Sequence, residues 1–296
     1  MPELQVPPGV EGLVSIAELP DAAWRDRWDR IFLPDGVKDR LLNYALFLLL
    51  HRGRLSSVGL PAHGLVVLAG PPGTGKTTLA GGLADQLARV RDDGPLLFVS
   101  IDPHAFPSQL LGESQRSTAR LFERTLPDLA RRGRPVVVLL DEVEALAVNR
   151  SGASLETNPV DVHRSTDAVL AGIDHVANAC PNVLFVATTN YRAGVDEAFL
   201  SRADLIEEIG DPGREAVRAI LTDTLAEVAP QAAIEPAVLV RVVDACVDGG
   251  FDARQVRKLV LRAVTSRREL ALEPERLNGD DLLVLVGSLE AEPVAF

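Results

Sequence analysis

The stretch Leu65-Val-Val-Leu-Ala69, followed at once by Gly70-Pro-Pro-Gly-Thr-Gly-Lys-Thr77, decides the fold of this chain. Five apolar residues that end at a glycine-rich turn are typical of a strand buried on both faces of a parallel sheet. The turn matches the phosphate-loop pattern G-x-x-x-x-G-K-S/T, in which backbone N–H groups point at phosphate oxygens. We expect Lys76 to contact the β- and γ-phosphates and act in catalysis, and the Thr77 hydroxyl to bind Mg²⁺. The nucleotide-binding residues expected here are Gly70, Pro71, Pro72, Gly73, Thr74, Gly75, Lys76, Thr77 and Thr78.

Apolar runs and helical patterns alternate on both sides of this loop. Further strands are predicted at Leu96–Ser100, Val136–Leu140, Val183–Ala187 and, shorter, Leu205–Ile209. Helical spacing covers Ala22–Arg54, Lys76–Arg91, Glu113–Arg132 and Pro159–Asn178. This alternation predicts an α/β fold with a parallel five-stranded sheet that is covered on both faces.

The pattern changes at Gly210-Asp-Pro-Gly213, beyond which the spacing is helical. We therefore expect an extended lead-in over residues 1–21, an α/β domain over 22–210 and a helical C-terminal domain over 211–296.

The composition excludes several classes of protein. The 296 residues include 42 acidic and 30 basic side chains, a formal net charge of −12, and 47% of them are hydrophobic, which is typical of a folded globular protein. No apolar run approaches the roughly 18 residues of a membrane span, and Met1–Val10 lacks the features of a secretory signal. Two cysteines fit a reducing cytoplasm, where we expect the protein. The acidic balance argues against nucleic acid binding, although a local basic pore stays compatible with it.

Two carboxylates stand at the end of the third predicted strand. Asp141-Glu142 follows five apolar residues, which brings it beside the phosphate loop at the carboxyl edge of the sheet. We expect Asp141 to hold Mg²⁺ and Glu142 to polarise the attacking water as the catalytic base. The alternative is a pair of solvated or helix-capping carboxylates.

An asparagine stands at the end of the fourth predicted strand, in Ala187-Thr-Thr-Asn190. An amide at this place can hydrogen-bond both the attacking water and the γ-phosphate, so Asn190 is a catalytic candidate. The alternative is an ordinary turn-forming asparagine.

Two arginines complete the set. Arg202 precedes the fifth predicted strand, where it can reach the γ-phosphate of a neighbouring subunit as a catalytic finger. Arg254 opens a helix that Asp252 is expected to N-cap, and it can reach back to the nucleotide. Each arginine on its own is also compatible with a solvated surface charge.

In this order, the motifs resemble those of an AAA+ ATPase with a helical lid domain. Finer residues resemble the pachytene-checkpoint family of HORMA-remodelling ATPases, over about Trp24 to Arg268. Besides the phosphate loop, the resemblance rests on Trp28–Lys38 with Leu41 and Leu42, Leu140–Leu146, Arg164, Asp167–Leu170 with Ile173-Asp174, Val195–Phe199, Arg202-Ala-Asp204, and Arg254 with Arg257-Lys-Leu259. Most AAA+ relatives carry two arginines in an Arg-Pro-Gly-Arg setting, whereas this chain has one.

The resemblance implies a homohexamer that binds ATP between subunits and grips a client chain with pore loops. The first pore loop would be Ser108–Gly112, with Leu110 and Leu111 contacting the client; the alternative is that both leucines are core residues at a helix start. A second loop, about Asn149 to His163, would lie deeper in the pore. Ile31 and Phe32, in the segment Trp28–Lys38, are further nucleotide-binding candidates.

The family therefore implies an ATP-driven unfoldase that disassembles HORMA-domain complexes by pulling on a client segment. Short, arginine-rich members resemble bacterial proteins that act beside HORMA proteins and a CD-NTase in CBASS antiphage systems. Eukaryotic members have an extra N-terminal client-binding domain. We expect no such domain in this sequence, because the roughly 20 residues before the matching region are too few for one.

Two other functions stay open. A DNA-directed AAA+ motor or loader would need a basic pore, and the acidic balance and the Leu-Leu loop count against it. A nucleotide-gated scaffold that processes nothing would not need Glu142 and Asn190.

Overall fold

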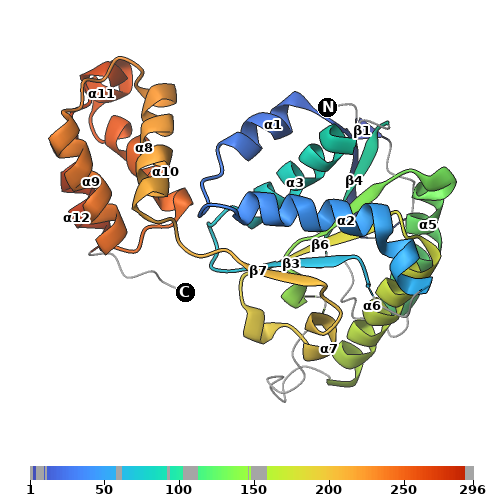
Figure 1. Ribbon diagram of the computed structural model, residues 1–296. Helices are drawn as coiled ribbons and strands as arrows, with labels where there is room; N and C mark the ends of the chain where they lie inside the picture. Colours follow the sequence, from blue (N-terminus) through green and yellow to red (C-terminus); the bar gives the residue numbers. More distant parts are fainter. Residues whose placement is uncertain are drawn as a thin grey trace. The chain divides into compact units, whose positions relative to one another are not determined.

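The computed structural model describes residues 3–4, 10, 12–57, 62–91, 94–102, 113–145, 147 and 159–290 (Figure 1). Contacts within the chain divide it into two compact units. The first comprises Met1–Trp28, Gly36–Gly70 and Lys76–Ile209. The second comprises Asp29–Asp35, Pro71–Gly75 and Gly210–Phe296. Two short internal segments are thus counted with the C-terminal part of the chain.

The first unit is built on a seven-stranded sheet in the order β1-β2-β4-β5-β6-β3-β7. Its strands are β1 (Glu3–Leu4), β2 (Leu13–Leu19), β3 (Leu65–Ala69), β4 (Leu96–Ile101), β5 (Val136–Leu140), β6 (Val183–Thr189) and β7 (Leu205–Glu208). The five predicted strands, β3 to β7, pair in parallel, which confirms the α/β fold class. The lead-in adds β2, antiparallel to β4, and β1, antiparallel to β2, so the sheet has two strands more than predicted.

Helices cover both faces of the sheet, so its three central parallel strands, β5, β6 and β3, are buried along their whole length. One face packs on α6 (Pro159–Ala179) and on the segment before β5, with the rings of Phe122 and Phe185 6.0 Å apart. The opposite face carries α2 (Val37–Ser57) and α3 (Lys76–Arg91), which contact each other and the central strands. The polar motifs stand at the carboxyl ends of the strands.

The segment before β5 is not one continuous α-helix as predicted. It consists of α4 (Glu113–Arg120), a π-helical turn (Leu121–Thr125), α5 (Leu126–Leu129) and a 3₁₀ turn (Arg131–Gly133). Pro127 explains the irregularity, since proline has no N–H to donate and clashes with the preceding turn of a regular helix.

Helix α1 (Ala22–Asp29) packs on α3 through two tryptophans. A Cβ atom on Gly81 would lie 2.3 Å from Trp24, and one on Gly82 would lie 2.9 Å from Trp28. Asp85, fully buried in α3, accepts a hydrogen bond of 2.7 Å from the backbone N–H of Asp21. The helix predicted over Ala22–Arg54 is therefore interrupted, because the chain turns at 30–36 before α2 begins.

The second unit is helical from α8 to α12. Its helices are α8 (Arg214–Val228), α9 (Pro236–Asp248), α10 (Ala253–Thr265), α11 (Arg268–Leu272) and α12 (Gly279–Glu290). Their apolar faces form one core, on which Phe32 also packs. Arg30 makes ion pairs with Asp223 and Glu227 of α8. Within the described part of the chain, none of the helices combines the length and apolar composition that crossing a bilayer requires.

Candidate active site

The two ends of the phosphate loop are fixed to the sheet unit. Gly70 has a φ of +152°, and a Cβ atom there would lie 1.9 Å from the carbonyl oxygen of Ile209, so only glycine fits. Lys76, 5% exposed at the start of α3, donates from Nζ to the carbonyl oxygen of Gly70 over 2.7 Å. The ammonium group is therefore held next to the loop that it is predicted to serve.

The middle of the loop, Pro71–Gly75, is counted with the helical unit. The Thr74 hydroxyl donates to the carbonyl oxygen of Pro71 (2.9 Å), and Gly73 has a φ of +85°. A Cβ atom on Gly73 would lie 2.3 Å from Oδ2 of Asp252. As predicted, Asp252 caps α10, in a capping box with Gln255, and Arg254 follows it in the first turn. The loop centre thus lies beside the helix end that carries Arg254.

Asp141 receives two threonine hydroxyls at the carboxyl edge of the sheet. Thr77 Oγ1 lies 2.8 Å from Asp141 Oδ1, and Thr188 Oγ1 lies 2.5 Å from the same oxygen. These contacts join the phosphate-loop helix, the end of β5 and the end of β6. The structure thus brings the predicted metal-binding residues Thr77 and Asp141 together.

Glu142 has an unusual backbone. Among the described residues it is the one non-glycine residue with a positive φ, at +56°. Left-handed backbone is costly for residues with a Cβ atom and persists where the surroundings impose it, often at functional sites. The side chain of Glu142 accepts a hydrogen bond of 3.1 Å from Nδ2 of Asn190. The predicted base and the predicted amide therefore face each other.

Asn190 is also held by a residue that the sequence did not indicate as functional. Glu144, in the 3₁₀ turn Val143–Ala145, accepts the backbone N–H of Asn190 at Oε1 over 3.0 Å. Glu144 thus binds the backbone of Asn190, and Glu142, which directly precedes the turn, binds its side chain. The one available signal was the acidic character of the segment Asp141–Glu144.

Arg202 is engaged within its own chain. Its Nε and Nη2 atoms each lie 2.8 Å from an oxygen of Asp174 in α6, and Nη1 donates to the carbonyl oxygen of Ala198. The hydrogen bond from Arg202 lowers the pKa of Asp174 below its ordinary value, and the same pair raises the pKa of Arg202. His63 lies 3.6 Å from Asp174. Asp174 thus positions the predicted finger residue, a role that residue types alone do not indicate.

Asp204, the third residue of the Arg-Ala-Asp motif, anchors the start of β3. Its carboxylate accepts the backbone N–H groups of His63 (3.1 Å) and Leu65 (2.9 Å). The hydroxyl of Tyr44 donates to its carbonyl oxygen over 2.6 Å. Asp204 is therefore a structural partner of the strand that leads into the phosphate loop.

The remaining candidates have different outcomes. Leu110 and Leu111 lie outside the described residues, as does most of the predicted second pore loop. His163 belongs to α6 rather than to a loop, and its side chain is outside the described part. Ile31 and Phe32 are half-buried in the segment that is counted with the helical unit.

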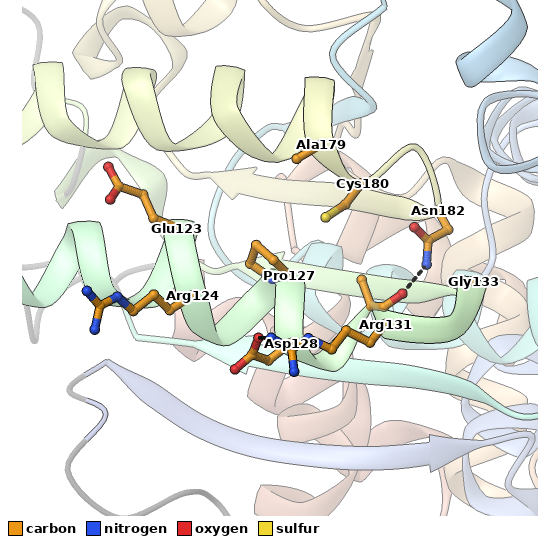
Figure 2. A pocket seen from close by; sticks show the side chains of 10 residues that line it. Glu123, Arg124, Pro127, Asp128, Arg131, Gly133, Ala179, Cys180 and Asn182 are labelled. Carbon is orange, nitrogen blue, oxygen red and sulfur yellow. Dashed lines mark hydrogen bonds and ion pairs between the residues drawn. The ribbon is translucent and has the colours of Figure 1, made fainter.

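A cavity of about 610 Å³ opens at the other edge of the sheet, near the amino ends of β5 and β6. Figure 2 shows its lining, which includes the Arg131–Asp128 ion pair (2.8 Å) and Asn182, whose amide donates to the Ala130 carbonyl oxygen (2.9 Å). Cys180 also lines it, and burial raises the pKa of that thiol. Because Asp141 and Asn190 stand at the carboxyl ends of these strands, this cavity is separate from the phosphate-binding edge.

Comparisons with known proteins agree with this geometry. The profile of the ATPase family associated with various cellular activities (AAA) matches residues 66–211. The CD-NTase-associated protein 6 of Pseudomonas aeruginosa is 40% identical over 268 residues, which cover 90% of this chain and 88% of that protein. This chain belongs to the pachytene-checkpoint branch of the AAA ATPases.

One further relative and one solved structure show how far the similarity of this AAA ATPase extends. The pachytene checkpoint protein 2 homologue of Danio rerio is 34% identical over 74% of the chain, which spans about half (52%) of that longer protein. A chain of the E. coli MS115-1 HORMA:CdnC:Trip13 complex has the same fold, with a TM-score of 0.80. It is 23% identical, and the match covers 98% of this chain and 100% of that one. The AAA ATPase is thus a nucleotide-binding enzyme that hydrolyses ATP.

Proposed function

We propose that this AAA ATPase is a homohexameric unfoldase that disassembles HORMA-domain protein complexes and regulates CBASS antiphage signalling in bacteria. ATP hydrolysis would pull a client segment through the pore of the hexamer. The proposed setting is the cytoplasm, where ATP is available and where the two buried cysteines, neither of which forms a disulfide, stay reduced.

The residues at the carboxyl edge divide the chemistry between them. Lys76 would contact the β- and γ-phosphates, because a charged phosphate oxygen is a stronger acceptor than the neutral carbonyl oxygen of Gly70, to which its Nζ donates. Glu142 would act as the base that orients the attacking water. Asn190, whose Nδ2 lies 3.1 Å from Oε1 of Glu142, would hydrogen-bond the water and the γ-phosphate. Facing carboxylate and amide groups beside Asp141 are the geometric observation that supports hydrolysis rather than binding alone.

The oxygen atoms around Asp141 fit Mg²⁺. This ion prefers oxygen ligands, and it is commonly held by one or two carboxylates together with substrate phosphates and water. Thr77 and Asp141 supply one hydroxyl and one carboxylate 2.8 Å apart, and within the described residues no group of three or more His, Cys, Asp or Glu side chains offers a complete protein cage. We assign Thr77 and Asp141 to Mg²⁺, which when bound would neutralise charge on the phosphates.

The two arginines would sense the nucleotide from different places. Arg202 would act in trans on the γ-phosphate of the neighbouring subunit, with Asp174, in the C-terminal half of α6, holding its guanidinium. Arg254 would bind the nucleotide from the first turn of α10, in the same unit as Pro71–Gly75. We retain Ile31 and Phe32 as candidates for nucleotide binding and Leu110, Leu111 and His163 as candidates for client contact.

The proposed setting beside a CD-NTase is supported by the 40% identity to CD-NTase-associated protein 6 over nearly the whole length of both proteins. The likeness to the HORMA:CdnC:Trip13 complex supports a HORMA protein, with or without a CD-NTase, as the partner. The net charge of −12 favours a protein client over nucleic acid.

Replacing the proposed base tests this function directly. Glu142→Gln should bind ATP, form stable hexamers and retain a HORMA protein in a pull-down, because hydrolysis slows by about 100-fold or more when the water is no longer polarised. ATP turnover, size-exclusion chromatography and the captured proteins are the measurements.

Glu275→Gln is the matched control, since Glu275 is exposed in the 3₁₀ turn Pro274–Arg276 of the helical unit. It should turn over ATP and release client like the wild type. Hydrolysis by Glu142→Gln at the wild-type rate would contradict the assignment of the base. Capture of no HORMA protein, together with no ATP-dependent release of a HORMA complex by the wild type, would contradict the proposed client.

A further inference from the structure

Thr188 occupies a buried position at the end of β6, next to the catalytic carboxylates. It is 1% exposed and pairs with Leu68 of β3. The register on its other side pairs Leu140 with Ala187, so the next residues along, Asp141 and Thr188, are neighbours. Thr188 therefore reaches Asp141 from the adjacent strand without facing solvent.

The Thr188 hydroxyl makes two hydrogen bonds of opposite sense. It donates to Oδ1 of Asp141 over 2.5 Å and accepts the backbone N–H of Glu142 over 3.0 Å. A hydroxyl has one proton and two lone pairs, so it can donate to the carboxylate and accept from the amide at the same time. Serine shares this ability, whereas valine, which has nearly the shape of threonine, has neither function.

These two bonds act on the residue with the strained backbone. Glu142 adopts its φ of +56° while its N–H is bound by Thr188 and its side chain by Asn190. A left-handed conformation at a non-glycine residue persists only where surrounding contacts impose it. Thr188 binds the N–H of Glu142 and Asn190 binds its side chain, while its carbonyl oxygen accepts the N–H of Ala145 over 3.0 Å.

We propose that Thr188 is a positioning residue for ATP hydrolysis. Its hydroxyl binds both the carboxylate of Asp141 and the backbone N–H of Glu142. The orientation of Glu142, the proposed base, is thereby fixed relative to Oδ1 of Asp141, the proposed Mg²⁺ ligand. This proposal rests on the roles proposed above for Asp141 and Glu142, and it assigns to Thr188 no contact with the nucleotide.

The test compares Thr188→Val with Thr188→Ser. The valine variant should lower kcat by about 10- to 100-fold, the usual loss when a hydrogen-bond partner of a metal-binding or catalytic group is removed. The serine variant should stay within about threefold of the wild type, because it keeps both hydrogen bonds. The affinity for a fluorescent ADP, measured without Mg²⁺, should change by less than about threefold in both, because Thr188 orients groups and does not bind the nucleotide. Thr188→Ala removes the same hydroxyl without branching and should reproduce the loss where the valine variant misfolds.

Thr189→Val is the matched control for the general effect of removing a buried threonine hydroxyl from this strand. Thr189 is fully buried in the same strand, and its hydroxyl accepts the backbone N–H of Tyr191 (3.1 Å). Its valine variant should lose a similar amount of thermal stability but keep kcat within about threefold, because it leaves the hydroxyl of Thr188 in place.

Four results would overturn the proposal: an unchanged kcat in Thr188→Val, an equal loss in Thr188→Ser, an equal loss in Thr189→Val, or a fall in ADP affinity as large as the fall in kcat. Glu142→Gln, measured in parallel, distinguishes failure of the role proposed for Glu142 from failure of the role proposed for Thr188. If it hydrolyses ATP normally, the role of Glu142 fails; if it is inactive while Thr188→Val is fully active, only the role of Thr188 fails.

Discussion

Arg202 and Asp174 form a two-pronged ion pair inside one chain, with both nitrogen–oxygen distances at 2.8 Å. Planar pairing of this kind fixes the orientation of the guanidinium more tightly than a single contact does. A subunit therefore holds its proposed finger in a defined direction before a neighbour is present. The side chain is 23% exposed, so part of it stays accessible while the pair is intact.

Arg202→Ala should leave nucleotide binding intact and lower ATP turnover by about 1,000-fold or more, as expected for the loss of an arginine finger. Fluorescent-ADP titration and steady-state turnover are the measurements. Arg131→Ala, which removes an exposed, ion-paired arginine at the far edge of the sheet, is the control and should not change turnover. Normal turnover by Arg202→Ala would remove the finger role.

The sequence was informative for residues that stand at predicted strand ends. Asp141, Glu142 and Asn190 could be selected because each follows a buried apolar run, and the structure brings all three together. Thr188, Glu144 and Asp174 could not be selected, because their contacts depend on strand register, on a short turn and on the packing of α6. Residue type and spacing contain none of that information.

At the scale of elements, the packing of α1 on α3 depends on two adjacent glycines. Gly81→Ala should destabilise the sheet unit by about 1–2 kcal/mol, because overpacking against Trp24 costs about 1–3 kcal/mol and better helix propensity returns up to about 1 kcal/mol. Urea unfolding measures the change.

Gly287→Ala is the matched control for this substitution. Gly287 lies in α12 with open space where a Cβ atom would stand, so alanine there should stabilise the helix by up to about 1 kcal/mol. A Gly81→Ala protein at least as stable as the wild type would show that α1 does not pack against α3 as described.

The elements differ in how far the sequence predicts them. Strands β3 to β6 were found because burial on both faces makes them uninterrupted apolar runs. Strand β2 was missed because it mixes buried and exposed residues and follows a stretch rich in proline and glycine. The break between α1 and α2 has a local sequence signal, Pro34 followed by Gly36, and Gly36 adopts a φ of +79° in the structure. The prediction missed this break because the tryptophans and leucines on both sides have helical spacing.

At the scale of the whole molecule, the net charge of −12 bears on the class of client. Double-stranded DNA should not stimulate ATP turnover at 50 mM salt, where attraction to a basic surface would be strong, whereas the HORMA complex should. A turnover assay with increasing DNA measures this. Stimulation by DNA that declines as salt rises would instead favour a DNA-directed motor.

The two outermost strands of the sheet have a consequence for solubility. One end is β1, two residues long, and the other is β7, four residues long with Glu207 and Glu208. Short or charged edge strands give other chains little backbone to pair with, which limits aggregation. Removing the lead-in through Leu19 would uncover β4, whose residues Leu96–Ile101 are almost all apolar. A shortened protein of this kind would expose an edge that recruits further copies, so β2 protects the enzyme from precipitation as well as completing its sheet.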